Sequence, residues 1–292
     1  MTDKIREAEQ KIADETDVVR KMNLTIELIS LYYYHDRVRG VSVADETFKL
    51  AQKIGHEVGM ARAILSKGNC NVALGNYREA LEQLAFAQSE LHRLGEKKFE
   101  STAFLNMSKM REAMGDFQTA LEYKYESLKL AKESGHIPVQ SINLANISLA
   151  HCKLNNIDKA LEFAHESLNF AKEHKDDLGW ANALVQLGLI HIHYVKDAKQ
   201  GLQYLNEALA KIDENPVIRD HWSLATIREN QALEYYKLQR YEDALQAAEE
   251  SLAIYQKMGD GHRQPNPLLI LSLIYSEQRR FDESLQCLQQ GE

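Results

Sequence analysis

Several features that mark other classes of protein are missing from this sequence. The first residues, MTDKIR, have no basic segment followed by an apolar run, so nothing indicates a secretory signal. No stretch approaches the ~18 uninterrupted apolar residues of a membrane-spanning helix. Lysine and arginine form no block, and the formal net charge is −8, which argues against nucleic acid and an anionic membrane surface as partners. We therefore expect a cytoplasmic protein.

Cysteine is also scarce. Cys70, Cys152 and Cys287 are far apart, and each lies within a helical pattern. An odd, unclustered set is typical of free thiols in a reducing compartment. No Cys-x-x-Cys or His-Glu-x-x-His motif occurs, and His191 and His193, two residues apart, would point to different faces of a helix. We expect no metal site.

The motifs of common catalytic sites are absent as well. The sequence holds no glycine-rich phosphate loop, no Gly-x-Ser-x-Gly and no kinase signature. His151 and Cys152 are adjacent, but neighbours on a helix diverge, and no third group is evident that would orient them. We expect neither enzyme activity nor a cofactor.

What the sequence has instead is one short pattern repeated at a nearly constant distance. GNYREAL at 75–81 recurs as GDFQTAL, NNIDKAL, KDAKQGL, QRYEDAL and RRFDESL. The sixth residue of each copy falls at 80, 120, 160, 201, 244 and 284. A period of this size predicts stacked helical hairpins. The step from 160 to 201 indicates one extra residue in the helix before the fourth copy.

Apolar residues at helical spacing surround each copy, and no stretch alternates with period two, so we expect helices and no strands. The pattern predicts a leading helix over about 3–14, followed by two kinds of helix in alternation. Helix A, before each copy, is predicted over about 17–36, 58–74, 98–114, 138–154, 177–194, 218–238 and 264–278. Helix B, from each copy onward, is predicted over about 42–54, 77–94, 117–134, 157–173, 198–212, 241–258 and 281–292.

The few glycines and prolines fall at the predicted helix ends. Glycine just past a helix end adopts the left-handed conformation that closes the last turn; such glycines follow B helices at Gly55, Gly95, Gly135 and Gly259. Proline is tolerated at the start of a helix; all the prolines lie between a B helix and the next A helix, at Pro138, Pro216, Pro265 and Pro267. The turn from A to B carries Gly75 or Gly115 in two copies.

These features resemble the tetratricopeptide repeat family. A small residue on helix A recurs at Gly68, Ser108, Ser148, Gly188, Ala232 and Ser272, and a large apolar residue follows the turn at Tyr77, Phe117, Ile157, Tyr241 and Phe281. The unit of about 40 residues is longer than the usual 34 and is similar to the long-helix branch found in kinesin light chains, Rap-type peptide receptors and bacterial signalling proteins. The resemblance implies an all-α fold, an α-α superhelix of about seven hairpins, in which the small residue allows close helix contact and the large one fills the space between hairpins.

The predicted organisation is a leading cap at 1–16 and one tandem-repeat solenoid at 17–292. The repeats are predicted at about 17–56, 57–97, 98–136, 137–175, 176–216, 217–260 and 261–292. The last B helix would need several residues beyond Glu292 to match the others. We therefore expect the sequence to be a fragment, with a further domain joined after it in the parent protein.

The resemblance implies a binding groove lined by the A helices. The residue two positions before the small one is a carboxamide in four repeats, Asn106, Asn146, Gln186 and Asn230, and neighbouring positions add Asn69, Lys109 and Leu233. A column of carboxamides can donate to and accept from an extended peptide backbone. The alternative, that each amide bonds a neighbouring helix or water, stays equally open.

Some members of the family clamp the terminal carboxylate of chaperone tails with lysine, arginine and asparagine. The matching positions here hold Leu65, Asn69, Asn106, Ile142 and Asn146, so the asparagines match and the cations are missing. A carboxylate without a cation would be poorly held, which argues against a chaperone adaptor.

The sequence thus predicts a non-catalytic scaffold that binds a protein or peptide segment. The first hypothesis is the sensory or regulatory module of a larger bacterial signalling protein, such as a cyclase, diguanylate cyclase or kinase, with a C-terminal effector domain as partner. The alternative is a free-standing adaptor or peptide receptor that assembles partner proteins. A homodimer through the last helix is a further hypothesis.

Overall fold

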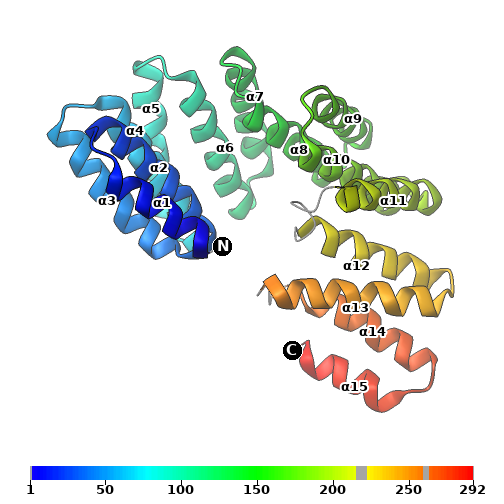
Figure 1. Cartoon of the computed structure of the whole chain (residues 1–292). Coiled ribbons are helices and arrows are strands. Elements are labelled where there is room, and N and C mark those ends of the chain that lie inside the picture. Colours follow the sequence, from blue (N-terminus) through cyan, green and yellow to red (C-terminus); the bar gives the residue numbers. More distant parts are fainter. Residues whose placement is uncertain (1, 215–221, 259–262, 292) are drawn as a thin grey trace. The chain divides into compact units, whose positions relative to one another are not determined.

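The computed structural model describes residues 2–214, 222–258 and 263–291, and within them the chain forms fifteen α-helices, one π-helical turn and no strand (Figure 1). The leading helix is α1 (Thr2–Asp14). The A helices are α2 (Val18–His35), α4 (Glu57–Leu74), α6 (Lys97–Ala113), α8 (Ile137–Lys153), α10 (Asp177–Ile190), α12 (Trp222–Lys237) and α14 (Pro265–Glu277). The B helices are α3 (Arg37–Lys53), α5 (Tyr77–Arg93), α7 (Phe117–Glu133), α9 (Ile157–Glu173), α11 (Ala198–Glu214), α13 (Tyr241–Met258) and α15 (Phe281–Gln290). The all-α fold of helical hairpins is confirmed.

Two helix predictions need correction. The B helix predicted from 42 begins at Arg37, because the side chain of Asp36 accepts a hydrogen bond from the Arg39 amide at 2.9 Å and caps the helix. The A helix predicted over 177–194 is α-helical only to Ile190 and ends in a π-helical turn, η1 (His191–Val195). A π-helical turn accommodates one extra residue in a helix, which explains the longer step in the sequence. The helix end predicted at Gly259 and the proline at 216 lie outside the described residues.

The chain divides into two compact units, unit 1 (1–147) and unit 2 (148–292), with the boundary inside α8. In unit 1 the consecutive A helices α2, α4 and α6 contact one another, and the B helices α3 and α5 each contact the following A helix. Unit 2 repeats this arrangement with α10, α12 and α14 as its contacting A helices. Each unit therefore has a layer of A helices on which residues of the same repeat position lie side by side.

The small residues on the A helices sit where the two helices of a hairpin meet, as predicted. A Cβ atom on Gly68 would lie 2.9 Å from Leu84 Cγ, closer than side chains tolerate. Ser148 occupies the same repeat position on α8, and its hydroxyl donates a hydrogen bond to the carbonyl oxygen of Ala160 on α9 at 2.7 Å. Small size at this position lets helix B approach helix A.

A left-handed residue recurs about every twenty residues, at both turns of a repeat. In unit 1 these residues are all glycine, with φ between 64° and 81°: Gly55, Gly75, Gly95, Gly115 and Gly135. The predictions for these glycines are confirmed. In unit 2 the corresponding residues carry side chains, with φ between 54° and 65°: Asn155, Lys175, Lys196, Gln239 and Arg279. Side chains raise the energy of this conformation, so the described turns of unit 2 are strained.

The large apolar residue after the turn fills the hairpin junction only in some repeats. Tyr241 packs against one apolar cluster of unit 2, and its ring centre lies 6.0 Å from that of Tyr236. Ile157 packs against another apolar cluster of the same unit. Phe281, in contrast, is 65% exposed. The predicted filling role is wrong for Phe281, because no described residue covers that side of α15.

The three cysteines are free and buried, as the sequence predicts. Burial raises the pKa of Cys70 and of Cys152 to about 11. Among the described residues, no helix combines the length and the apolar character that crossing a bilayer would require.

Candidate binding site on the A helices

The A-helix layer of unit 1 brings three predicted site residues together. Asn69 lies on α4, while Asn106 and Lys109 lie on the neighbouring α6. Asn106 is buried, and Asn69 and Lys109 are half-buried. The Oδ1 atom of Asn69 is buried and accepts no hydrogen bond from any described residue. Asn146, on α8, is half-buried as well.

Unit 1 also has a cation on this layer that the sequence analysis did not select. Arg62 lies seven residues before Asn69 and therefore on the same face of α4. Its Nη1 donates to Asn23 Oδ1 at 2.6 Å, and its guanidinium lies 4.1 Å from the centre of the Phe99 ring. Burial lowers the pKa of Arg62, an effect that the charge of Glu27 opposes.

A charged cluster lies between α6 and α7, next to these residues. Lys124 is only 1% exposed, and its Nζ lies 2.9 Å from Glu112 Oε1. The corresponding position is apolar in the other copies of the pattern, and it is fully buried in four of them, at Leu84, Ala164, Leu205 and Ala248. Lys124 was not predicted as a site residue, although a lysine at a position that is apolar in the other copies is visible in the sequence.

Lys109 lies on α6, three residues before Glu112, and is influenced by the charges of this cluster. Burial lowers the pKa of Lys109, the nearby Lys124 lowers it further, and Glu112 opposes the shift. The ammonium of Lys109 forms no ion pair with any described carboxylate at 4 Å or less. Lys109, Glu112 and Lys124 are therefore near enough for their charges to interact.

The A-helix layer of unit 2 contains Gln186 on α10 and Asn230 and Leu233 on α12. Asn230 is almost fully buried, and its Nδ2 donates to the carbonyl oxygen of Thr226 at 2.9 Å. Its Oδ1 lies 3.0 Å from Nε2 of His193, on η1. Gln186 and Leu233 are half-buried. The amide of Asn230 is therefore bonded within its own unit.

Beside Asn230, Glu229 forms a network that was not predicted. Its Oε2 accepts a hydrogen bond from the Tyr255 hydroxyl at 3.0 Å, and its Oε1 accepts one from Asn266 Nδ2 at 3.0 Å. Burial raises the pKa of Glu229, although these two bonds oppose the rise. Most other repeats have an apolar residue at this position, including Leu65, Leu105, Val185 and Leu269.

Two leucines add an apolar part to the same layer. Leu269 and Leu273 lie one turn apart on α14 and are 52% and 38% exposed. Leu233, on the adjacent α12, is half-buried. Unit 2 thus presents apolar and hydrogen-bonding groups together. No group of three or more histidine, cysteine or acidic side chains suited to a metal lies within the described residues.

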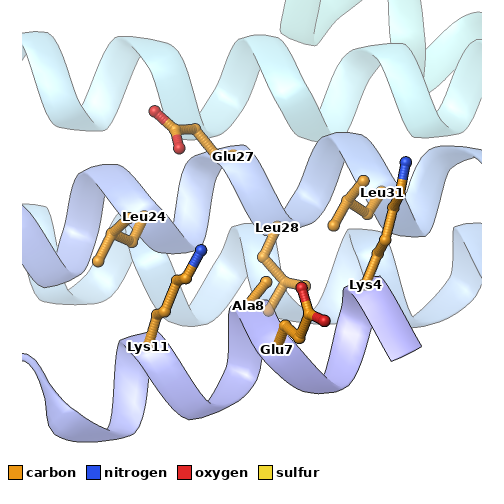
Figure 2. Close-up of a pocket in the computed structure, with 8 residues that line it drawn as sticks. All are labelled: Lys4, Glu7, Ala8, Lys11, Leu24, Glu27, Leu28 and Leu31. Carbon is orange, nitrogen blue, oxygen red and sulfur yellow. The ribbon is translucent and has the colours of Figure 1, made fainter. Parts of the chain in front are cut away.

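A surface pocket of about 320 Å³ is lined by residues of α1 and α2, and none of the predicted site residues lines it (Figure 2). Its floor is apolar, formed by Ala8, Leu24, Leu28 and Leu31. Its charged residues come in equal numbers of each sign: Lys4, Lys11, Glu7 and Glu27. This pocket shows no charge preference for a ligand.

The hairpins and their shared A-helix layers define a helical-repeat protein. Residues 224–258 match the tetratricopeptide repeat model, and the chain has the tetratricopeptide-type repeat fold, which is typical of protein and peptide binding. No curated protein matches the chain by sequence.

Solved structures with the same fold are distant in sequence. A signal-transduction ATPase with a tetratricopeptide repeat sensor from Pyrococcus horikoshii has a TM-score of 0.67 and 14% identity, covering 97% of this chain. The chain spans only 44% of that protein. A Rap protein complexed with competence and sporulation factor has a TM-score of 0.63 and 17% identity, covering 88% of this chain and 70% of that one. NprR in complex with its cognate peptide NprX has a TM-score of 0.58 and 14% identity, covering 95% of this chain and 79% of that one.

Proposed function

We propose that the chain is a non-catalytic scaffold that binds a protein or peptide segment on its A-helix layers. The observation that supports this most directly is in unit 2, where the exposed Leu269 and Leu273 lie on the same layer as the half-buried Leu233 and the half-buried, polar Glu229. An extended or helical peptide needs both apolar contacts and hydrogen-bonding groups. Of two proteins with the same fold, NprR is described in complex with its cognate peptide NprX, and the Rap protein is described in complex with competence and sporulation factor.

We propose further that this scaffold is cytoplasmic and is the sensory or regulatory module of a larger bacterial signalling protein. The similar fold of the repeat sensor in the signal-transduction ATPase, of which the chain spans less than half, supports this context. The partner would then be a peptide, a protein or an effector domain of the same parent. The alternative is a free-standing adaptor or peptide receptor, and the sequence of the natural gene on both sides of these residues distinguishes the two.

The surface is tested by capturing partners from a lysate of the source organism on the immobilised chain. Asn106, Asn146 and Asn230 are changed together to alanine, and we expect the captured partners to be lost. The matched control changes exposed amides on B helices, Gln118, Gln203 and Gln256, to alanine and should retain them. If the first variant folds and still captures the same partners, the asparagines are structural and the proposed site is wrong.

A further inference from the structure

The last helix, α15, carries an apolar stripe that no described helix covers. Phe281, Leu285 and Leu288 are spaced by four and three residues and therefore lie on one face of the helix. Their exposed fractions are 65%, 56% and 45%. Among the described helices, α14 is the one that α15 contacts extensively (Figure 1). Contiguous exposed apolar side chains of this kind are typical of an interaction surface.

The same stripe is covered by a helix elsewhere in unit 2. On α13 the equivalent residues are Tyr241, Leu245 and Ala248. Ala248 is fully buried, and the other two pack against an apolar cluster to which the following helix, α14, contributes Leu268 and Leu271. The equivalent residues of α9 lie in an apolar cluster with side chains of α10: Ile157, Leu161 and Ala164. The stripe on α15 is therefore a surface whose shape fits another helix.

The charges at the two ends of α15 favour one particular helix. The guanidinium of Arg279, just before α15, is exposed and makes no hydrogen bond or ion pair with any described residue. Arg280, beside it, is already paired with Glu283 at 2.8 Å and lies 4.3 Å from the centre of the Tyr275 ring. At the other end, the last carbonyl groups of a helix lack partners within the helix and carry partial negative charge. An antiparallel copy of α15 would match both ends.

We propose that the stripe is the interface of a homodimer, in which the α15 helices of two copies pack antiparallel about a two-fold axis. Such an interface uses the same patch on both copies, so its contacts are reciprocal. With Leu285 at the axis, Phe281 lies opposite the partner's Leu288, and Arg279 lies at the C-terminal end of the partner's α15. A parallel pairing would bring the two Arg279 side chains together, which like charges oppose.

This interface is separate from the proposed peptide-binding surface. The stripe lies on a B helix, whereas the proposed site lies on the A helices. A dimer formed through α15 therefore presents two A-helix layers of each kind. Such a dimer would bind two partner segments, or one partner that has two copies of the segment, and the second case gains affinity from the linkage.

The association is measured by light scattering after size-exclusion chromatography, over about a hundredfold range of concentration of the full chain. We expect the mass to rise from monomer to dimer. Leu285→Asp puts a carboxylate at the axis on both copies and should weaken the dimer at least about tenfold. Phe86→Asp is the matched control, because Phe86 also lies on a B helix and is 51% exposed, and it should leave the association unchanged. Circular dichroism confirms that each variant is folded.

The antiparallel geometry is tested separately. Leu285→Cys should form a disulfide between copies on mild oxidation, because facing residues at the axis lie within reach of each other. Gln286→Cys, one residue further along and exposed, points away from the stripe and should not. Both variants also carry Cys287→Ala, so that the native thiol of α15 takes no part. Arg279→Glu should weaken the dimer about fivefold at low salt, because it repels the C-terminal end of the partner's α15.

A mass that stays monomeric over the whole range would overturn the homodimer. A dimer that Leu285→Asp does not weaken, or in which Leu285→Cys does not cross-link, would place the contact elsewhere and also overturn it. If the chain is monomeric and captures another protein that Leu285→Asp does not capture, the stripe belongs to that partner instead. None of these outcomes depends on the asparagines of the A helices, so the dimer and the proposed function succeed or fail separately.

Discussion

A Cβ atom added to Gly201 would lie 2.8 Å from the carbonyl oxygen of Gly188. It would also lie 2.5 Å from Cγ1 of Ile192, on the π-helical turn. In the other copies this repeat position holds alanine or serine: Ala80, Ala120, Ala160, Ala244 and Ser284. The fourth hairpin of the recurring pattern is therefore packed more closely than the others.

We predict that Gly201→Ala, although it restores the residue common to the other copies, destabilises the protein. Overpacking of this kind typically lowers the free energy of unfolding by about 1–3 kcal/mol. Denaturant unfolding followed by circular dichroism measures the change. In a helix without close contacts, Gly→Ala would instead raise stability by about 1 kcal/mol, so an increase would contradict the packing described here.

The strained turns of unit 2 give the opposite prediction. Lys175 and Gln239 have φ of 54° and 58° and exposed side chains, so Lys175→Gly and Gln239→Gly should relieve strain. Glycine relieves the strain of the left-handed conformation but also gives the unfolded chain more freedom. We expect the net effect to raise the free energy of unfolding by about 0.5–1 kcal/mol for each change. Gly115→Ala in unit 1, at φ of 81°, is the matched control and should lower it. Destabilisation by both glycine variants would show that these turns are not strained.

Thiol reactivity should follow burial. With a pKa of about 11 for Cys70 and for Cys152, the thiolate fraction at pH 8 is about a hundredfold lower than for a thiol with the ordinary pKa of 9.0. We expect iodoacetamide to modify both residues at least about a hundredfold more slowly in the native protein than in urea. Mass spectrometry of the digested protein measures the two rates. Cys287, which is less deeply buried at 9% exposure, should react first. Rapid native labelling of Cys70 would contradict its burial against α3.

The stability of unit 2 should depend on the ionisation of Glu229. Burial raises its pKa above the ordinary value of 4.5, so the folded state holds the proton more tightly than the unfolded state. The stability contributed by this group is therefore complete below pH 4.5 and is lost as the pH rises through the raised value. Glu229→Gln, which stays neutral, should gain stability relative to the native sequence between about pH 4 and pH 7. Denaturant unfolding at several pH values measures this difference, and exposed Glu207→Gln serves as the control. A difference that shrinks as the pH rises would contradict the shift.

The repeat could be predicted because most positions have the same structural role in most copies. Gly68 and Ser148, for example, are both small because helix B approaches there. The features that sequence analysis missed are places where a single copy departs from the others, such as Lys124 at a core position or Glu229 at an apolar one. The predicted amides show a second limit. Asn106 and Asn146 occupy equivalent positions, yet one is buried and the other half-buried, because exposure depends on the size of side chains from neighbouring helices that the repeat pattern does not specify.

The buried pair of Glu112 and Lys124 has a consequence for how the chain finds its native pairing of helices. Similar hairpins can associate in the wrong order during folding, since their apolar faces are nearly interchangeable. If α7 packed against α4, Lys124 would meet Val72 in place of Glu112, and an unpaired buried ammonium would be unfavourable by about 3–5 kcal/mol. The ion pair between Glu112 and Lys124 thus favours the pairing of α7 with α6 over its pairing with α4, and so favours the native order of the hairpins in unit 1.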